Sequence, residues 1–352
     1  MGGVNASPNY VTTVGIGLPS GKVNNTTTQG GIVSIYYLGA IVGAFVGGWI
    51  ADRAGRINGL LLSAVFALIG GALQSATQSL DFILVARVVT GLGTGALTAI
   101  TPVYIAEVSA ADHRGGFLGY VFIANYLGIS VAYWLDFGLS FVDGGNSAVR
   151  WRFLLAFQCF PAIILLAGIK FLPDSPRYLA SVGRLDEARE VLEHIRGSQG
   201  AEVEKEFLEI CVVAEGTKPS SPVQFVKVLL GRTNSGHLGR RAWLCLWLQI
   251  MASWSGITAV TAYSPVLLTQ AGYGSIKQGG LAGGLNTVGI LGTIISAQII
   301  DRFGRRPCLI WGSCGLFIVN LFAASLYEGS RSNPAKAASI APAAVTMWVV
   351  VT

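Results

Sequence analysis

A short charged pattern occurs twice in the chain, each time between two long apolar segments. The first copy is Asp52-Arg53-Ala54-Gly55-Arg56, and the second is Asp301-Arg302-Phe303-Gly304-Arg305, which Arg306 follows. In each copy a glycine permits backbone angles that other residues resist, so the chain can turn tightly between the two apolar segments. One such hairpin is common in membrane proteins. Two copies in the same context, about 250 residues apart, predict an internally duplicated membrane protein.

The composition of the chain fits a membrane protein and excludes other classes. Of its 352 residues, 52% are hydrophobic and only 12% are charged, whereas soluble domains carry about 25% charged residues. We therefore predict an all-α, polytopic membrane protein that contacts the lipid bilayer. The net charge of +6 alone would suggest a nucleic-acid partner. We expect none, because Lys and Arg gather in loops on one side of the predicted membrane.

The apolar segments predict eight complete transmembrane helices and part of a ninth. Each complete segment is near the length of about 20 residues that a helix needs to cross a bilayer. The last apolar run begins near Ile340 and stops at Thr352, which is too short to cross. The predicted spans are Ile32–Ile50, Asn58–Ala76, Phe82–Ile105, Phe117–Leu135, Phe153–Leu172, Ala242–Leu268, Gly279–Ile300 and Leu309–Tyr327.

The distribution of charge predicts the orientation and the domains. Most Lys and Arg fall on the side of the Asp52–Arg56 turn, which the positive-inside rule makes cytoplasmic. The two overlapping glycosylation sequons in Asn24-Asn25-Thr26-Thr27 then lie outside. We expect an N-terminal helical bundle over 1–172, a cytoplasmic segment over 173–241 and a partial C-terminal bundle over 242–352. Helical spacing of Leu185, Ala188, Leu192 and Ile195 favours a small helical cap for the cytoplasmic segment; a simple linker is the alternative.

The chain lacks the motifs of an enzyme. It contains no P-loop, no His-Glu-x-x-His and no Gly-x-Ser-x-Gly nucleophile elbow. Gly91-Leu92-Gly93-Thr94-Gly95 resembles part of a dinucleotide-binding loop, but it lies inside a predicted span, where close helix packing explains it better. The five cysteines and three histidines show no metal-ligand spacing. We expect no catalytic residues, no cofactor and no metal.

One predicted span carries polar residues along a single face. Arg87, Thr90, Thr94, Thr98 and Thr101 recur at helical spacing. An arginine inside a bilayer costs about 2.5–3.5 kcal/mol on insertion scales unless it faces protein or water. This face is therefore expected to line the interior of the bundle. Alternatively, the threonines bond to their own helix backbone and Arg87 only extends toward the membrane surface.

Several motifs occur together in an order that resembles one known family. Besides the two charged turns they are Arg87-x-x-x-Gly91-x-Gly93-x-Gly95, the group Pro102, Tyr104, Glu107, Arg114 and Gly115, the pair Trp151-Arg152, and Pro173-Asp174-Ser175-Pro176-Arg177-Tyr178-Leu179. This set resembles the sugar porter family of the major facilitator superfamily over nearly the whole chain. The segment Gln29–Ser34 and the stretch near Trp254 look most like fungal members.

The resemblance implies the twelve-helix, two-bundle fold of that superfamily, of which this chain would hold helices 2 to 9 and the start of helix 10. The chain is therefore expected to be truncated at both ends relative to the family. The resemblance also implies a network of charges that closes the cytoplasmic side. The matching positions are Asp52, Arg53, Arg56, Glu107, Arg114, Asp174, Arg177, Asp301, Arg302, Arg305 and Arg306. Asp174 replaces the usual Glu of the family.

The expected substrate site departs from the family pattern. The amide-rich pattern Gln-Gln-x-Ser-Gly-x-Asn is replaced by Ala252-Ser253-Trp254-Ser255-Gly256-Ile257-Thr258, and Phe122 and Gly289 stand at positions of a Gln and an Asn. Because a site that selects a hexose must bond its hydroxyls, this change favours a smaller polyol or a less polar solute. The candidate substrate-binding residues are Arg87, Thr94, Asn125, Ser253, Trp254, Thr258, Tyr263 and Asn286.

These observations predict a secondary active or facilitative transporter of a sugar or small polyol that works by alternating access. A proton is a second candidate ligand, although no carboxylate lies in the middle of a predicted span. A multi-pass protein of the plasma membrane is expected. Two alternatives stay open: a nutrient sensor of the same fold that no longer transports, and a non-functional truncated product.

Overall fold

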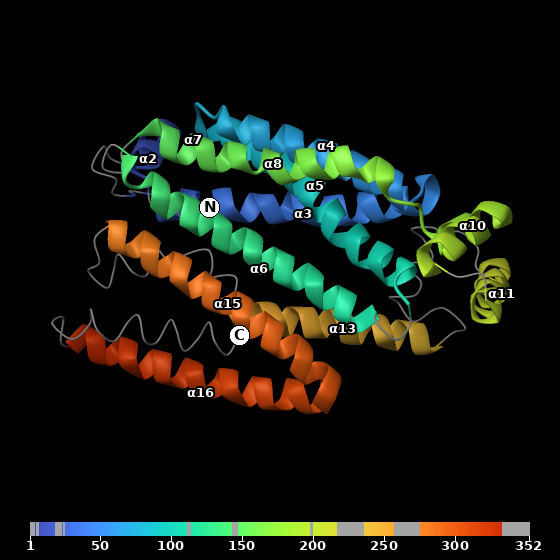
Figure 1. Ribbon diagram of the computed structural model, residues 1–352. Helices are drawn as coiled ribbons and strands as arrows, with labels where there is room; N and C mark the ends of the chain where they lie inside the picture. The colour runs from blue at the N-terminus through green and yellow to red at the C-terminus, as the bar shows by residue number, and fades with distance from the viewer. Residues whose placement is uncertain are drawn as a thin grey trace. The chain divides into compact units, whose positions relative to one another are not determined.

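The computed structural model describes residues 4, 7–17, 23, 25–110, 114–142, 147–197, 200–216, 236–256 and 275–332. Within these residues every element is a helix, apart from one isolated β-bridge between Gly17 and Val23 (Figure 1). The all-α prediction is therefore confirmed.

The helices fall into two compact units. One unit comprises Met1–Gln29, Leu118–Leu154 and Cys245–Thr352, and the other comprises Gly30–Phe117 and Leu155–Leu244. This division groups segments differently from the predicted bundles 1–172 and 242–352 and segment 173–241, whose boundaries stay a prediction. The first unit holds α2 (Pro8–Val14), most of α6 (Arg114–Leu139) and α7 (Ala148–Phe157), part of α13 (Gly236–Trp254), α15 (Ser275–Phe303) and α16 (Arg305–Ser332).

The second unit contains the helices on either side of the first charged turn. They are α3 (Thr26–Ala54), of which the first residues belong to the other unit, α4 (Arg56–Ser75), α5 (Leu80–Val108), α8 (Cys159–Gly168), the 3₁₀ turn η2 (Ile169–Phe171), α9 (Pro176–Ser181), α10 (Leu185–Arg196) and α11 (Ala201–Gly216).

Six helical segments of the described chain are long and apolar enough to cross a membrane. They are Thr26–Ala54, Arg56–Ser75, Leu80–Val108, Gly115–Leu139, Ala148–Phe171 and Lys277–Ile299. They match six of the eight predicted spans. Of the predicted span Ala242–Leu268, only the part up to Gly256 is described, and Leu309–Tyr327 corresponds to the shorter apolar helix Arg306–Phe322. The partial ninth span lies outside the described residues. The protein is an integral, multi-pass membrane protein.

The predicted span Phe153–Leu172 is not one continuous helix. It is divided into α7, α8 and η2, and the first interruption is at Gln158. Pro161 explains this position, because a proline has no backbone N–H to donate and its ring collides with the carbonyl group four residues earlier. That carbonyl belongs to Phe157, the last residue of α7.

Glycines bring α3, α4 and α5 into close contact. A Cβ atom at Gly43 of α3 would overlap the backbone of Leu92, and one at Gly95 of α5 would overlap the backbone of Ala40. On the opposite side of α5, a Cβ at Gly93 would overlap the backbone of α4. Small residues let helix backbones approach in this way inside a membrane. The interpretation of Gly91–Gly95 as a helix-packing motif is therefore confirmed.

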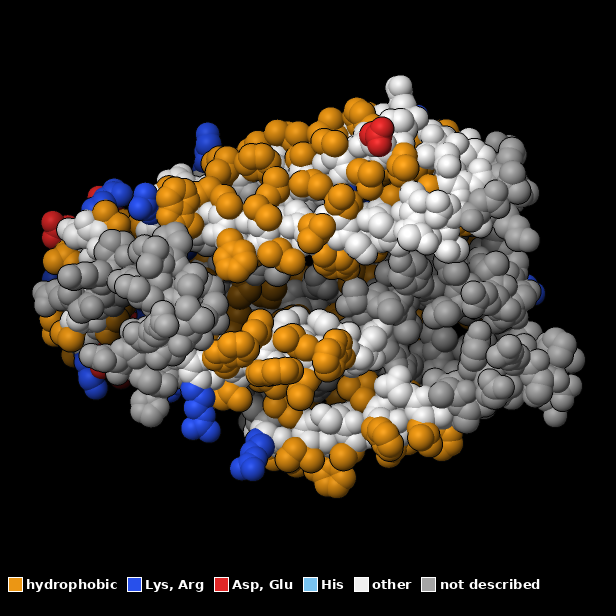
Figure 2. All heavy atoms as spheres, turned by 180° about the vertical axis from the view of Figure 1, so that it is seen from behind, with side chains coloured by type: hydrophobic (Ala, Val, Ile, Leu, Met, Phe, Trp, Pro, Cys, Tyr) orange, Lys and Arg blue, Asp and Glu red, His pale blue; other side chains and the backbone are white. Residues whose placement is uncertain are grey.

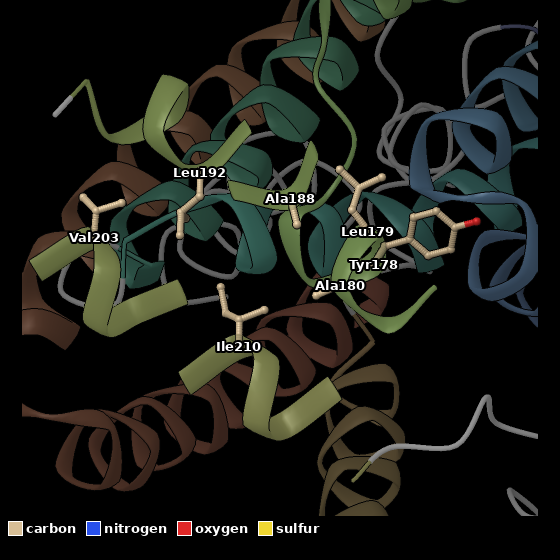
Figure 3. Close-up of a cluster of buried hydrophobic side chains, with 7 residues drawn as sticks. All are labelled: Tyr178, Leu179, Ala180, Ala188, Leu192, Val203 and Ile210. Carbon is tan, nitrogen blue, oxygen red and sulfur yellow. The ribbon is translucent and has the colours of Figure 1, made fainter. Parts of the chain in front are cut away.

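Helices α9, α10 and α11 form a small module with its own apolar core. The core side chains gather between the three helices (Figure 3) and are Tyr178, Leu179, Ala180, Ala188, Leu192, Val203 and Ile210. The described part of segment 173–241 is thus a packed helical module and not a simple linker. The apolar patch Phe225–Leu230 lies outside the described residues.

Large hydrophobic side chains cover the outer faces of the long helices. On α3 they include Leu38, Ile41 and Phe45, and on α16 Trp311, Phe317 and Leu321. Figure 2 shows hydrophobic side chains spread along the helices, while Lys, Arg, Asp and Glu gather over the end that carries α10 and α11. In water such a surface would be costly, but it matches the hydrocarbon interior of a bilayer.

Candidate functional site

The first charged turn builds a compact cluster where α3 ends and α4 begins. Gly55 has φ +98° and links the two helices, and Arg56 is the first residue of α4. The Arg56 guanidinium donates to both carboxylate oxygens of Glu107 on α5, with Nε–Oε2 at 2.9 Å and Nη2–Oε1 at 3.0 Å. The two side chains are only 12% and 15% exposed. This bidentate geometry is the strongest that arginine and a carboxylate form.

Asp174 joins the cluster from the segment before α9. Its Oδ1 accepts the backbone N–H of Arg56 at 3.1 Å and the backbone N–H of Ser175 at 2.8 Å. The first N–H groups of a helix have no partner within it, so Asp174 satisfies one of them for α4. A Cβ atom at position 55 would collide with the Asp174 carboxylate. Glycine is thus required there both for its backbone angle and for space.

Two tyrosines that were not among the predicted site residues complete the cluster. The Tyr178 hydroxyl donates to the carbonyl oxygen of Arg53 at 3.2 Å, and its ring lies 5.3 Å from the guanidinium of Arg56. The Tyr104 hydroxyl donates to the carbonyl oxygen of Pro173 at 2.8 Å. Both residues belong to motifs recognisable in the sequence, but their hydroxyl groups bond to backbone atoms, which spacing alone does not indicate.

The structure gathers some of the predicted network residues and not others. Asp52 lies 3.4 Å from Arg56, so Asp52, Arg56, Glu107 and Asp174 form one group. Arg53 is exposed and lies over the ring of Trp49. The exposed residues Arg177, Arg302 and Arg306 form no ion pair with any side chain that the structure describes. The side chains of Arg114, Asp301 and Arg305 lie outside the described residues.

The polar face of α5 is buried within the second unit at Arg87 and Thr90, whereas Thr98 is exposed. Arg87 is 6% exposed, and its guanidinium carbon lies 5.7 Å from the ring centre of Tyr36. The hydroxyl groups of Thr90, Thr94 and Thr98 each bond to the carbonyl oxygen four residues earlier, at 2.8–2.9 Å. These threonines therefore satisfy their own helix, as one interpretation of the sequence held, while Arg87 stays inside the protein.

Two of these threonines also contact neighbouring helices. Thr94 bonds to the hydroxyl of Tyr36 on α3 at 2.8 Å. Thr90 accepts from the amide nitrogen of Gln74, which is almost fully buried on α4. The amide nitrogen is the donor in this bond, because Thr90 already gives its single proton to the carbonyl oxygen of Ala86. Gln74 was not predicted as a site residue.

The other predicted substrate residues lie in the first unit or outside the described part. Asn125 on α6 is exposed, as are Ser253 and Trp254 near the end of α13, where Trp254 is 79% exposed. Asn286 on α15 is buried and donates from its amide nitrogen to the carbonyl oxygen of Ala282 at 2.8 Å. Thr258 and Tyr263 lie outside the described residues. The role of this set stays a prediction.

Helices α6 and α15 run side by side in opposite directions with a constant register (Figure 1). Position 119 of α6 faces Ala297, Ser130 faces Thr287, Trp134 faces Gly283 and Phe137 faces Gly279. The contacts extend over about 27 Å at 1.5 Å per residue. That length approaches the bilayer core of about 30 Å, so the pair is in contact across most of the membrane.

We call this line of contacts between α6 and α15 the α6–α15 seam. A threonine at its centre bonds to both helices. Thr287 Oγ1 donates to the carbonyl of Gly283 at 2.9 Å, and it accepts from Trp134 Nε1 at 3.0 Å. The Ser130 hydroxyl lies 2.9 Å away and must be the donor, because a threonine has one proton to give. None of these residues was predicted to belong to a site. The glycines at 279, 280 and 283, which face aromatic rings, were the only signal.

Residues near position 10 pack against α7, a contact that was not predicted. Tyr10 and Val11 of α2 are fully buried. Asn9 accepts a hydrogen bond of 3.0 Å from the indole nitrogen of Trp151, a residue that is itself fully buried on α7. Close in sequence, Arg150 makes a buried bidentate ion pair with Asp136, at 2.9 and 3.1 Å. These contacts tie residues near position 10 to the adjoining ends of α6 and α7.

Comparisons with known proteins agree with this architecture. The family described as "Sugar (and other) transporter" matches residues 1–352. The probable inositol transporter 2 of Arabidopsis thaliana is 32% identical over 319 residues, which are 88% of this chain and 53% of that protein. The galactose-proton symporter of Escherichia coli K12 is 31% identical over 288 residues, or 81% and 58% of the two chains. The chain thus spans between half and two thirds of the length of these relatives.

A bacterial transporter gives the structural comparison. The xylose transporter XylE of E. coli, in a partially occluded inward open conformation, aligns with a TM-score of 0.77 over 99% of this chain and 79% of that one, at 20% identity. This likeness shows the fold. The relatives come from plants, bacteria and a fungus, so fungal origin stays a prediction. With the whole chain matched and the transporter fold present, the chain belongs to the sugar porter family of the major facilitator superfamily.

Proposed function

We propose that this protein carries a sugar or a small polyol across a membrane by alternating access, in which the solute path opens to one side at a time. The observation that supports the proposal most directly is the cluster of Arg56, Glu107 and Asp174 at the first repeated turn. The chain that carries this cluster is matched over its whole length by a transporter family. The names of its relatives include an inositol transporter, a galactose-proton symporter and a D-xylose transporter.

The cluster at the first charged turn contains buried residues, whose contacts we expect to stay fixed, and exposed residues, which can change their contacts. Arg56 and Glu107 lie within one compact unit and are mostly buried, so their pair acts as a scaffold. Arg53 and Arg177 are exposed at the edge of the same cluster. A charge favours one state only if its contacts differ between the states. In this proposal the exposed arginines change partners during the cycle, while the scaffold fixes the turn that carries them. Asp301, Arg302, Arg305 and Arg306 of the second repeated turn are proposed to change partners in the same way.

The proposed substrate class follows from the polar groups that the chain offers. Candidate contacts are the predicted set Arg87, Thr94, Asn125, Ser253, Trp254, Thr258, Tyr263 and Asn286. Threonines that already bond to their own backbone and to a neighbouring helix have little capacity left for a solute, as at the partly buried Thr94. A site with few free amide and hydroxyl groups discriminates poorly among hexose hydroxyls. This reasoning favours a small polyol over a hexose.

Uptake into proteoliposomes tests the proposal. The purified chain is reconstituted and supplied with labelled glycerol, inositol, xylose or glucose, with and without a pH gradient, and protein-free liposomes serve as the control. We expect saturable uptake that excess unlabelled solute suppresses, with a polyol preferred and with lower rates for Thr258→Val and Tyr263→Phe. Uptake no faster than in protein-free liposomes would contradict transport. Strong glucose uptake that neither substitution affects would contradict the proposed polyol site.

Two further measurements address the coupling and the location. Acceleration of uptake by the pH gradient would indicate proton coupling. Expression of the protein with a fluorescent tag tests the proposed plasma-membrane location.

A further inference from the structure

Arg196 connects three helices through one guanidinium group. It is the last residue of α10, and its Nη1 donates to the carbonyl oxygen of Val108, the last residue of α5, at 3.0 Å. Its Nε and Nη2 donate to the two carboxylate oxygens of Glu206 on α11, at 2.9 and 2.8 Å. The side chain is 15% exposed. The side chain of Glu206 is 36% exposed, so the three bonds are partly protected from water.

The position of Arg196 suits the end of a helix. The last carbonyl groups of α5 have no partner within the helix, and the partial negative charge of a helix C-terminus attracts a cation. The planar fork of arginine can serve a carboxylate with two N–H groups while a third reaches another acceptor. Hydrogen bonding to Glu206 raises the pKa of Arg196, so the cation persists at all physiological pH values.

In the part of the chain that the structure describes, further hydrogen bonds to the membrane helices lie at or just before the start of this module. Tyr104 bonds to Pro173, Asp174 to the backbone of Arg56, and Tyr178 to the carbonyl of Arg53. Between that first attachment and Arg196 lie a turn at Gly183, with φ +86°, and the whole of α10. The helix is about 18 Å long at 1.5 Å per residue. Arg196 is thus a second attachment, far along the module from the first.

We propose that Arg196 is a positioning residue that fastens the α10–α11 part of the module to the end of α5, so that the module and α5 move as one body. A single attachment at α9 leaves a body free to turn about that point, whereas a second attachment fixes its direction. α5 also carries Arg87 and Thr94, two of the candidate substrate-binding residues. Because the module is attached to α5, a movement of α5 during transport would carry the module with it. The consequence for transport rests on the proposed function; the attachment itself does not.

The same helix supplies a matched control. Arg189 of α10 bonds to Glu193 and to Glu204 of α11, so it also links α10 to α11, but none of its described contacts reaches α5. Arg189→Gln and Arg196→Gln remove the same charge from the same helix. They differ in the contact with Val108, which only Arg196→Gln removes, and in exposure, which is 15% for the side chain of Arg196 and 51% for that of Arg189.

Hydrogen–deuterium exchange on the full chain in nanodiscs tests the attachment. We expect Arg196→Gln to speed exchange in α10 and α11 about tenfold, equivalent to about 1.4 kcal/mol, while α9 and the helices α3, α4 and α5 keep their protection. Arg189→Gln should change the same peptides less than about threefold. Arg196→Lys keeps one charged donor for Val108 and should fall between the two, and it carries the test if Arg196→Gln does not accumulate.

Two outcomes overturn the proposal. One is equal exchange in Arg196→Gln and Arg189→Gln, which would show that the contact with α5 positions nothing. The other is faster exchange throughout α3, α4 and α5, which would show general loss of stability. Uptake adds a separate readout: we expect a lower maximal rate with an unchanged KM for Arg196→Gln. Absence of uptake by the unsubstituted protein would reject the proposed function, while the exchange data would still decide the attachment.

Discussion

Replacing Glu107 by glutamine should weaken the inner end of the second unit by about 2 to 3 kcal/mol. In the folded protein Arg56 makes two charge-assisted hydrogen bonds to Glu107, and both side chains are mostly buried. Glutamine keeps one acceptor oxygen but removes the negative charge. A hydrogen bond to a charged group contributes about 1.5–3 kcal/mol, and breaking a fully buried pair costs about 3–5 kcal/mol. Because the two side chains are slightly exposed, the expected loss of stability lies between the loss for an exposed pair and the loss for a fully buried pair.

The measurement is thermal unfolding of the purified protein in detergent. With a shift of about 2–4 °C per kcal/mol, the midpoint of Glu107→Gln should fall by about 5 to 10 °C. Glu187→Gln is the matched control, because Glu187 pairs with Arg184 where both side chains are at least half exposed; such pairs contribute about 0–1 kcal/mol. Adding Arg56→Gln completes a double-mutant cycle, which should give a coupling energy of about 2 kcal/mol. Equal midpoints for the two glutamate variants would refute the reasoning.

Three tests with glycine substitutions address the packing. Gly55→Ala should lower the unfolding midpoint more than Gly304→Ala, because both have positive φ but only at Gly55 does a carboxylate occupy the place of the new Cβ; equal losses would mean that backbone strain alone matters. Gly43→Ala should destabilise the protein by several degrees, since its Cβ would overlap the backbone of α5; an unchanged midpoint would contradict the close α3–α5 contact. Gly283→Val should displace a tryptophan ring and change its fluorescence, whereas Gly284→Val, with open space around it, should not; identical spectra would argue against the α6–α15 seam.

The sequence was sufficient to predict the features that follow from solvation. A long apolar helix has few alternatives to crossing a bilayer, and six predicted spans appear as such helices. Charges at the ends of such helices find few partners, so Arg56, Glu107 and Asp174 could be grouped from the family motifs. The structure adds what Asp174 does: its short carboxylate bonds to the backbone of Arg56.

The sequence was not sufficient to predict which helices pack together. The seam between Trp134 and Thr287 joins residues more than 150 positions apart, and its bonds depend on a register that no local pattern specifies. Likewise, Tyr10 is fully buried with its ring against Trp151, a residue about 140 positions away in the sequence. The glycine at position 283 leaves room for the ring of Trp134, but a glycine in a sequence does not identify the ring that fills the space.

The central claim is that the two repeated turns mark the inner ends of the two halves of one carrier. Single cysteines at Arg53 and at Arg302, both exposed, can be introduced into a variant in which the five native cysteines are replaced. A membrane-impermeant maleimide is then applied to intact cells and to inside-out vesicles. The account predicts that both positions react only in inside-out vesicles. Reaction of one position from outside and the other from inside would contradict it.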